Sequence, residues 1–343
     1  MILLFADKRG DLRVVLTIRS STLNSCIYLC NRSYHRQLAN LFPDAGQAAL
    51  PGGKTDTLLE TPIETARREA NEEIGLPLPT YPTLAPGVTN AESSPFADSS
   101  YSPDTPSLPY PFELEHLCQL PTNLAKTELG VRPCVAFLHA TSPVDRNNKP
   151  VDAEAALIPR LDAKEVAAVF SGPFHNFLSL NDELPSGLAE KPEGEWYRGQ
   201  WIDWHEEPFR MHNFYVPIQG QVVTRPRPTK AEKESVKKLK PDTASSAAYP
   251  PQAGLSTLPY RDLSDPLASL SRFRVFGMTA RILVDCARLA YGEEPKFEHN
   301  GHFGDESIIA KLIEVGKLGV ERKKGEEFKD NELKNVLKAS GRL

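Results

Sequence analysis

Three glutamates with helical spacing could bind a divalent metal ion. Glu69, Glu72 and Glu73 stand at positions i, i+3 and i+4, so a helix would place their carboxylates on one side. Carboxylate oxygens suit hard ions such as magnesium and manganese, which can polarise a phosphoryl oxygen and lower the pKa of a bound water. The spacing therefore indicates hydrolysis of a phosphate-containing bond. A solvated acidic face is the alternative explanation.

The neighbouring residues favour the metal site over the solvated face. Pro51–Gly53 predicts a tight turn directly before the helix, where glycine lets the backbone approach a ligand closely. Glu60 stands just ahead of the helix and can orient Arg68, which can also pair with Glu72 at i, i+4. An acidic cluster with its own arginine and a glycine turn is better explained as a site than as a surface.

The element that must position these side chains is a helix over Pro62–Ile74. Thr61 can cap its start, and Glu64 three residues later completes a capping box. Gly75 can take the left-handed conformation that ends a helix, and Pro77 blocks its continuation. Apolar residues on a narrow arc beside the glutamates should pack on a sheet: Ile63, Ala66, Ala70 and Ile74.

Other apolar segments predict the rest of the fold. They are a hairpin from Ile2–Phe5 and Leu12–Ile18, a buried strand at Arg132–His139, a helical approach to the core over Lys164–Phe170 and Phe174–Leu178, and a C-terminal helix over Phe273–Ala290. The aromatic segment Trp201–Asn213 has two interpretations. It either lines a substrate pocket or forms an aromatic-rich core or hairpin.

The stretch with the glutamates resembles the signature of the Nudix hydrolases. It reads Gly53-x6-Glu60-x7-Arg68-Glu69-Ala70-x-Glu72-Glu73-x-Gly75-Leu76, with one more residue after the first glycine than the general family pattern has. The coenzyme A diphosphatase branch has a similarly lengthened loop of the type GGKxD, which is matched by Gly52–Asp56.

A second motif of that branch precedes the first in the expected order. The branch has LTxRSxxL followed by a glycine, and this chain has the matching segment Leu16–Leu23 and then Gly46. Fainter similarity continues through Arg132–His139, Glu165–Leu178 and Phe276–Ala280. Two linked motifs indicate membership of the branch rather than a chance match.

The resemblance implies an α+β fold, an α/β/α sandwich in which helices flank a central mixed β-sheet. It implies metal-dependent hydrolysis of the diphosphate in coenzyme A or its derivatives, giving 3',5'-ADP and 4'-phosphopantetheine or its acyl form. A Nudix diphosphatase for another nucleoside diphosphate, such as ADP-ribose or a dinucleotide, is an alternative. A non-catalytic binding module of the same fold is another.

The residues that the resemblance assigns fall into three groups. The catalytic set is Glu60, Arg68, Glu69, Glu72 and Glu73. Within it, the ligands of Mg²⁺ or Mn²⁺ are Glu69, Glu72 and Glu73. The substrate-binding set is Arg19, Ser20, Gly46, Gln47, Gly52 and Gly53. The general base is open, with Glu128 and Glu165 as candidates.

Composition indicates how the chain divides. Proline-rich and polar stretches separate the apolar segments, so we expect a catalytic domain at residues 1–220, a disordered linker at 221–264 and a helical segment with a polar tail at 265–343. The catalytic domain should hold a disordered loop at 82–111 and an insert at 24–45. That insert is either a lid over the pocket or a retained intron, and we expect catalysis not to require it.

Charge and cysteine content limit the partners. A formal net charge of -5 argues against a protein that binds nucleic acid through a basic face, so a small-molecule partner is expected. Five cysteines without a paired framework suggest a reducing compartment, and Cys26, Cys30 and His35 lack a fourth zinc ligand. No apolar run is long enough to span a membrane. The tripeptide 341–343, Gly-Arg-Leu, resembles a peroxisomal address, with the cytoplasm as the alternative location.

Overall fold

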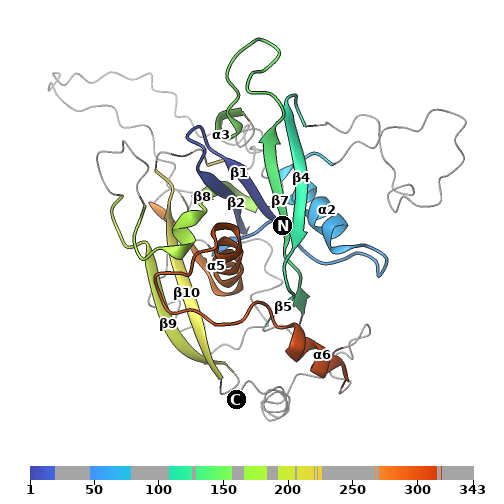
Figure 1. The fold of residues 1–343 in the computed structure, drawn as a ribbon, viewed down its shortest axis with the longest axis vertical. Coiled ribbons are helices and arrows are strands. Elements are labelled where there is room, and N and C mark those ends of the chain that lie inside the picture. The colour runs from blue at the N-terminus through green and yellow to red at the C-terminus, as the bar shows by residue number, and fades with distance from the viewer. Residues whose placement is uncertain are drawn as a thin grey trace, which may run out of the picture.

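A large mixed β-sheet forms the centre of this protein in the computed structural model (Figure 1). The structure describes residues 1–19, 47–78, 108–125, 129–156, 166–183, 192–204, 207–219, 221, 223–225, 267, 270–314 and 318. The strands of the sheet are β1 Ile2–Ala6, β2 Leu12–Arg19, β3 Gln47–Ala49, β4 Phe112–Gln119, β7 Cys134–Ala140, β8 Val166–Pro173, β9 Tyr197–Trp204, β10 Glu207–Pro217 and β11 Arg272–Phe276. A separate pair consists of β5 Asn123–Leu124 and β6 Gly130–Val131.

The strand order mixes parallel and antiparallel neighbours. It runs β4-β7-β1-β2-β3-β11-β10-β9, and β8 also pairs with β2. The pairs β1–β7 and β3–β11 are parallel, and the other pairs in the sheet are antiparallel. The helices are α2 Pro62–Ile74, α3 Ala153–Ala156, the 3₁₀ helix η3 His175–Leu178, α5 Gly277–Tyr291 and α6 Glu306–Glu314. The predicted α+β architecture with a central mixed sheet is confirmed.

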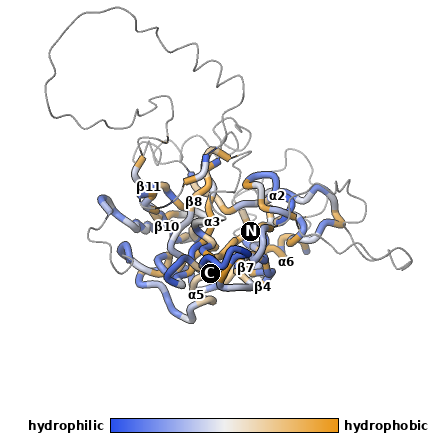
Figure 2. Tube along the Cα trace, turned by 90° about the horizontal axis from the view of Figure 1, so that it is seen from above, coloured by the Kyte–Doolittle hydropathy of each residue, from blue (hydrophilic) through white to orange (hydrophobic). Residues whose placement is uncertain are grey.

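Two apolar clusters lie on the two faces of the sheet. One contains buried residues of α5 with Val14, Leu16, Phe214 and Phe273. The other contains the apolar arc of α2 with strand residues such as Leu3 and Val15. In Figure 2, α2 and α5 lie on opposite sides of the N-terminus. Helices therefore cover both faces, because the alternating side chains of each strand need apolar partners on both sides.

The helix α2 follows its sequence signals at both ends. The hydroxyl of Thr61 accepts a hydrogen bond from the backbone N–H of Glu64, and the Glu64 carboxylate accepts one from the backbone N–H of Thr61 at 2.7 Å. Gly75 takes the left-handed conformation with φ 67° and ends the helix. The predicted bounds Pro62–Ile74 are confirmed, and Ala66, Ala70 and Ile74 are buried as expected.

The predicted helical approach to the core over Lys164–Phe170 and Phe174–Leu178 is wrong in its first part. Lys164–Phe170 was expected to be helical, but Val166–Pro173 is strand β8, which pairs with β2. A short, continuous apolar run has no periodicity that separates a buried strand from a helix, and its pairing with β2 decides the outcome. Phe174–Leu178 does contain a helical turn, η3.

The C-terminal helix begins four residues later than expected. Arg272–Phe276 is strand β11, and α5 follows from Gly277. The segment alternates between arginine and apolar residues, and Phe273 and Val275 enter the α5-side core. That period of two is the strand period. The segment after the predicted linker therefore contributes a strand between β3 and β10 as well as a helix.

Other expectations agree with the structure where it describes them. Ile2–Phe5 and Leu12–Ile18 form the hairpin β1–β2, Arg132–His139 overlaps β7, and Trp201–Asn213 belongs to the hairpin β9–β10. The insert 24–45, residues 82–107 of the predicted loop, residues 226–264 of the linker, Cys26, Cys30, His35 and the tripeptide 341–343 lie outside the described residues. Within the described ranges, no helix has the length and apolar character needed to cross a membrane.

Replacing Thr61 with alanine should lower the free energy of unfolding by about 1 kcal/mol, because the N–H of Glu64 loses its side-chain acceptor. Urea unfolding followed by circular dichroism measures this change. Thr57→Ala is the matched control, since Thr57 is an exposed residue of the preceding loop and should change stability by less than about 0.5 kcal/mol. Equal effects of the two substitutions would contradict the capping role.

Candidate active site

The turn Pro51–Gly53 lies directly against the helix α2. The backbone N–H of Gly52 donates a hydrogen bond to Oε2 of Glu73 at 3.0 Å, and Gly52 has a φ of 150°. A Cβ atom at Gly53 would collide with the carboxylate of Glu69. The backbone conformation of Gly52 therefore requires glycine, whereas glycine at position 53 leaves the Glu69 carboxylate the space it occupies.

Arg68 is the hub of the polar contacts around the glutamates. Its Nε lies 2.9 Å from Oε1 of Glu60, and its Nη2 donates to the carbonyl oxygen of Lys54 at 2.8 Å. Its Nη1 lies 3.3 Å from Oε1 of Glu69 and 3.2 Å from Oε2 of Glu72. One guanidinium thus ties together the backbone just after the turn, Glu60 ahead of the helix and two helical carboxylates.

The carboxylates around Arg68 differ in the direction of their pKa shifts. Burial alone would raise the pKa of Glu60, but the hydrogen bonds and charge of Arg68 outweigh it and hold this pKa below its ordinary value. Burial raises the pKa of Glu73 to about 7, and the N–H of Gly52 and the charge of Arg19 offset only part of this shift. Burial also raises the pKa of Glu69, although Arg68 opposes it. The negative charges of Glu69 and Glu73 are therefore undercompensated.

The uncompensated charge of Glu69 and Glu73 bears on whether these residues could bind a divalent cation. As the side chains lie, no group of three or more histidine, cysteine, aspartate or glutamate residues within the described ranges is gathered closely enough to hold a metal ion. Nη1 of Arg68 bonds to both Glu69 and Glu72. Glu69 and Glu73 offer half-buried carboxylate oxygens whose charges lack compensation, and a hard cation would supply it. These two residues fit the expected ion best, and Glu72 is more exposed.

The residues of the branch motif are only partly described. Arg19 ends β2 beside a β-bulge, and its charge acts on Glu73. Gln47 begins β3 and is exposed. Ser20, Gly46 and the two candidate bases Glu128 and Glu165 lie outside the described residues. The structure therefore brings Arg19 together with the glycine turn and α2, and Gln47 is placed on the strand that leads into that turn.

Sequence reasoning missed Arg274, a buried arginine that neighbours Gln47 across the parallel pair β11–β3. Its guanidinium donates to Oδ1 of Asn213 at 2.7 and 3.0 Å and lies 4.3 Å from the ring centre of Phe276. Its neighbour Val275 enters the α5-side core, so Arg274 belongs to the face of the sheet that carries α2. The alternating pattern of Arg272–Phe276 was the signal that could have found it.

Comparisons with known proteins agree with the motifs. No protein-family model matches the chain. The peroxisomal coenzyme A diphosphatase 1 of Saccharomyces cerevisiae is 25% identical over 328 residues, which cover 92% of this chain and 75% of that protein. Two proteins of Arabidopsis thaliana also match: Nudix hydrolase 15, mitochondrial, at 38% identity over 204 residues, and Nudix hydrolase 22, chloroplastic, at 30% over 214 residues. These matches cover 60% and 62% of this chain, and 48% and 45% of the two plant proteins, about half their length.

Gly53→Ala should weaken Mn²⁺ binding by on the order of tenfold or more, because the new Cβ displaces the Glu69 carboxylate. Calorimetric titration with Mn²⁺ measures the affinity. Gly301→Ala is the matched control, since a Cβ at Gly301 meets no atom within 4 Å. Unchanged Mn²⁺ affinity in a folded Gly53→Ala protein would remove the Gly53–Glu69 contact from the site.

Glu73→Gln should stabilise the metal-free protein at pH 8 by on the order of 2 kcal/mol, since each pKa unit corresponds to 1.36 kcal/mol. The folded state binds the Glu73 proton more tightly than the unfolded state does, so ionisation of Glu73 destabilises the fold as pH rises from about 4.5 towards 7. Urea unfolding in the presence of a chelator should therefore show a gain at pH 8 that shrinks by pH 5. A gain that does not depend on pH would contradict this origin.

Proposed function

Because the chain belongs to the Nudix hydrolase family, we propose that it hydrolyses the diphosphate of coenzyme A and its thioesters. The products would be 3',5'-ADP and 4'-phosphopantetheine or its acyl form. The observation that carries the proposal is the half-buried pair Glu69 and Glu73, held against the Gly52-Gly53 turn by Arg68 and the backbone. This arrangement concentrates negative charge at a backbone turn, where a cation and a diphosphate can be bound together.

The residues of this chain have distinct roles in the proposed reaction. Glu69 and Glu73 would hold a divalent ion, Mg²⁺ or Mn²⁺, with Glu72 as a further ligand. When bound, such an ion neutralises diphosphate charge and lowers the pKa of a bound water. Arg68 fixes Glu69 through its Nη1 and is itself fixed by Glu60. The Gly52-Gly53 turn leaves room for the substrate because no side chain projects from it.

Arg19 and Gln47 would contact the substrate on the sheet side of the turn. The charge of Arg19 already acts on Glu73, so a phosphate bound between the metal ligands and β2 would lie beside this guanidinium. Gln47 is exposed on the strand that leads into the turn. Ser20 and Gly46 complete the proposed substrate-binding set.

The choice of coenzyme A over other diphosphates is supported by two branch motifs and by the name of the yeast relative. The zinc-binding cysteines and the SQPWPFP-type segment of the NADH branch are absent from the sequence. A non-catalytic binding module is less well supported, because all the carboxylates of the signature are present. The peroxisome is the proposed location, since the yeast relative is named as peroxisomal. The division into residues 1–220, 221–264 and 265–343 stays a proposal.

Coenzyme A should be cleaved with a higher kcat/KM than ADP-ribose or NADH in the presence of Mg²⁺ or Mn²⁺, because its 3'-phosphate and pantetheine arm add binding energy. Glu73→Gln should lower kcat by at least about 100-fold, a loss expected for a metal ligand. Product analysis by chromatography measures both, and Glu113→Gln on strand β4 is the control for removing an exposed glutamate. A higher kcat/KM for ADP-ribose would overturn the substrate but not the family, whereas full activity of Glu73→Gln would overturn the site.

A further inference from the structure

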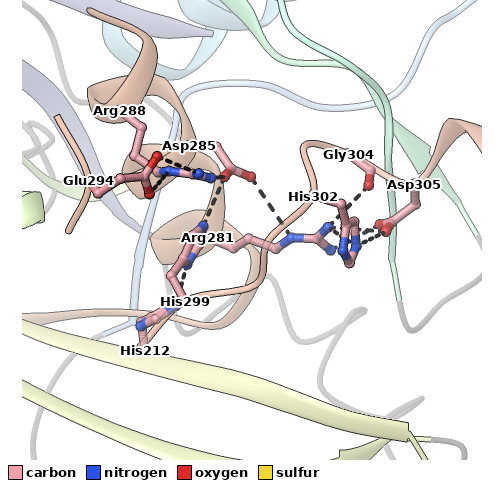
Figure 3. Close-up of polar contacts among 9 residues, drawn as sticks. All are labelled: His212, Arg281, Asp285, Arg288, Glu294, His299, His302, Gly304 and Asp305. Atoms are coloured by element: carbon pink, nitrogen blue, oxygen red, sulfur yellow. Dashed lines mark hydrogen bonds and ion pairs between the residues drawn. The ribbon is translucent and has the colours of Figure 1, made fainter. Parts of the chain in front are cut away.

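A line of hydrogen-bonded side chains is buried on the face of the sheet that α5 covers. The hydroxyl of Tyr197 lies 3.0 Å from Nδ1 of His212, and Nε2 of His212 lies 2.8 Å from Nδ1 of His299. Nε2 of His299 lies 2.9 Å from Oδ1 of Asp285. The line thus crosses from β9 and β10 to the segment after α5 and ends on α5, as Figure 3 shows for His212, His299 and Asp285. His212 is fully buried, and the side chain of His299 is 4% exposed.

The direction of hydrogen bonding is fixed at both ends of this line. The guanidinium of Arg210 bonds to the hydroxyl of Tyr197 and can only donate. The ionised carboxylate of Asp285 can only accept. Between these ends each group donates to the next, so Tyr197 donates to His212, His212 donates from Nε2 to His299, and His299 donates from Nε2 to Asp285. In this arrangement both histidines are neutral and carry their proton on Nε2.

An additional proton has no place in this arrangement. If His299 took it on Nδ1, two N–H groups would face each other across the 2.8 Å between the histidines. If His212 then moved its own proton to Nδ1, that proton would face the hydroxyl of Tyr197 and displace the Tyr197 proton from its acceptor. Either state leaves a buried donor without an acceptor, which costs about 1 to 3 kcal/mol.

The charged groups around His212 and His299 have opposite effects on the protonation of these rings. Burial lowers the pKa of His212 to about 3; a charge on His299 would add to this shift, as the charges of Arg210 and Arg281 do. Asp285 faces His299 as an anion, but Arg288 lies 3.4 Å from its Oδ1 and Arg281 lies 4.0 Å from its Oδ2. The carboxylates of Glu294 and Glu298 are taken up by Arg288 and Arg210 at 2.9 and 3.2 Å. Burial and these arginines therefore disfavour a charge on His212.

The pair holds the segment Gly292–Asp305 on the hairpin β9–β10. Phe297 of this segment stacks on the ring of Tyr197 at 4.1 Å, and Glu298 accepts a hydrogen bond from the indole of Trp201 at 2.7 Å. At its far end Asp305 pairs with Arg281 of α5 at 3.0 Å. The hairpin is bonded through β11 to β3, which leads into the glycine turn of the candidate active site. Release of the segment would therefore loosen the edge of the sheet that reaches this site.

We propose that the His212–His299 pair is an acid-sensitive latch, in which uptake of one proton breaks the line and releases Gly292–Asp305 from the hairpin β9–β10. A histidine that is held neutral in the folded state and is free in the opened state takes up its proton on opening. The latch is therefore fully closed above the ordinary histidine pKa of about 6.5 and opens as pH falls below it. This device does not depend on the proposed reaction.

Hydrogen exchange of the full-length chain, corrected for intrinsic rates at each pH, tests the latch. The opened population of Gly292–Asp305 should rise by up to about tenfold for each pH unit below about 6.5, as uptake of one proton requires. His299→Gln should weaken this pH dependence, because its amide does not titrate and only His212 remains to take up a proton. His116→Gln is the control, since His116 is an exposed histidine of β4 and its loss should leave the dependence unchanged.

Equal protection of the segment at pH 7.5 and 5.5, or an unchanged pH dependence in His299→Gln, would overturn the proposal. If His299→Gln does not fold, nitrogen chemical shifts of the histidine rings in the unmodified protein test the latch instead, because they report which ring nitrogen carries the proton. At pH 7.5 both His212 and His299 should carry a single proton on Nε2. A proton on Nδ1 of either ring at that pH would overturn the latch.

Discussion

The like charges of Glu69 and Glu73 on the helix α2 are the constraint on which the candidate site depends. Two half-buried carboxylates one helical turn apart repel each other, and partial burial disfavours the charge of both. The fold tolerates them because the N–H of Gly52 and the guanidinium of Arg68 compensate part of the charge. What remains is uncompensated negative charge, which the proposed divalent cation would neutralise.

The caps and the apolar packing of α2 fix the positions of these two carboxylates. Its capped ends fix where the helix begins and stops, and its apolar arc, Ala66, Ala70 and Ile74, anchors it in the core on one face of the sheet. The glycine turn is fixed from the other side by β3, which lies between β2 and β11. The carboxylates therefore belong to a rigid helix and meet a turn held by a strand, and a site built on regular elements keeps its geometry better than one built on loops.

The two faces of the sheet treat buried polar groups differently. On the α2 side, negative charge is left partly uncompensated, which suits a site that binds a cation. On the α5 side, the polar groups between Tyr197 and Asp285 satisfy one another in a single direction, and the ion pair of Arg281 and Asp305 is matched within the fold. Buried polar groups that bond to one another favour one arrangement, whereas uncompensated charge favours the binding of a counter-ion.

The sequence alone determined the helix Pro62–Ile74, its buried arc and the contacts of Arg68 with Glu60 and Glu72, because capping, helical periodicity and i, i+4 pairing act between residues close in the chain. It also indicated the hairpin β1–β2 and the family. Tertiary structure decided that Val166–Pro173 is a strand, because that segment is paired along β2, and that the helix after Phe276 begins late, because Arg272–Phe276 completes the sheet between β3 and β10. It also decided the pKa of Glu73 and the line from Tyr197 to Asp285. Burial and hydrogen bonds between segments distant in the chain set both of these, and residue spacing carries no record of either.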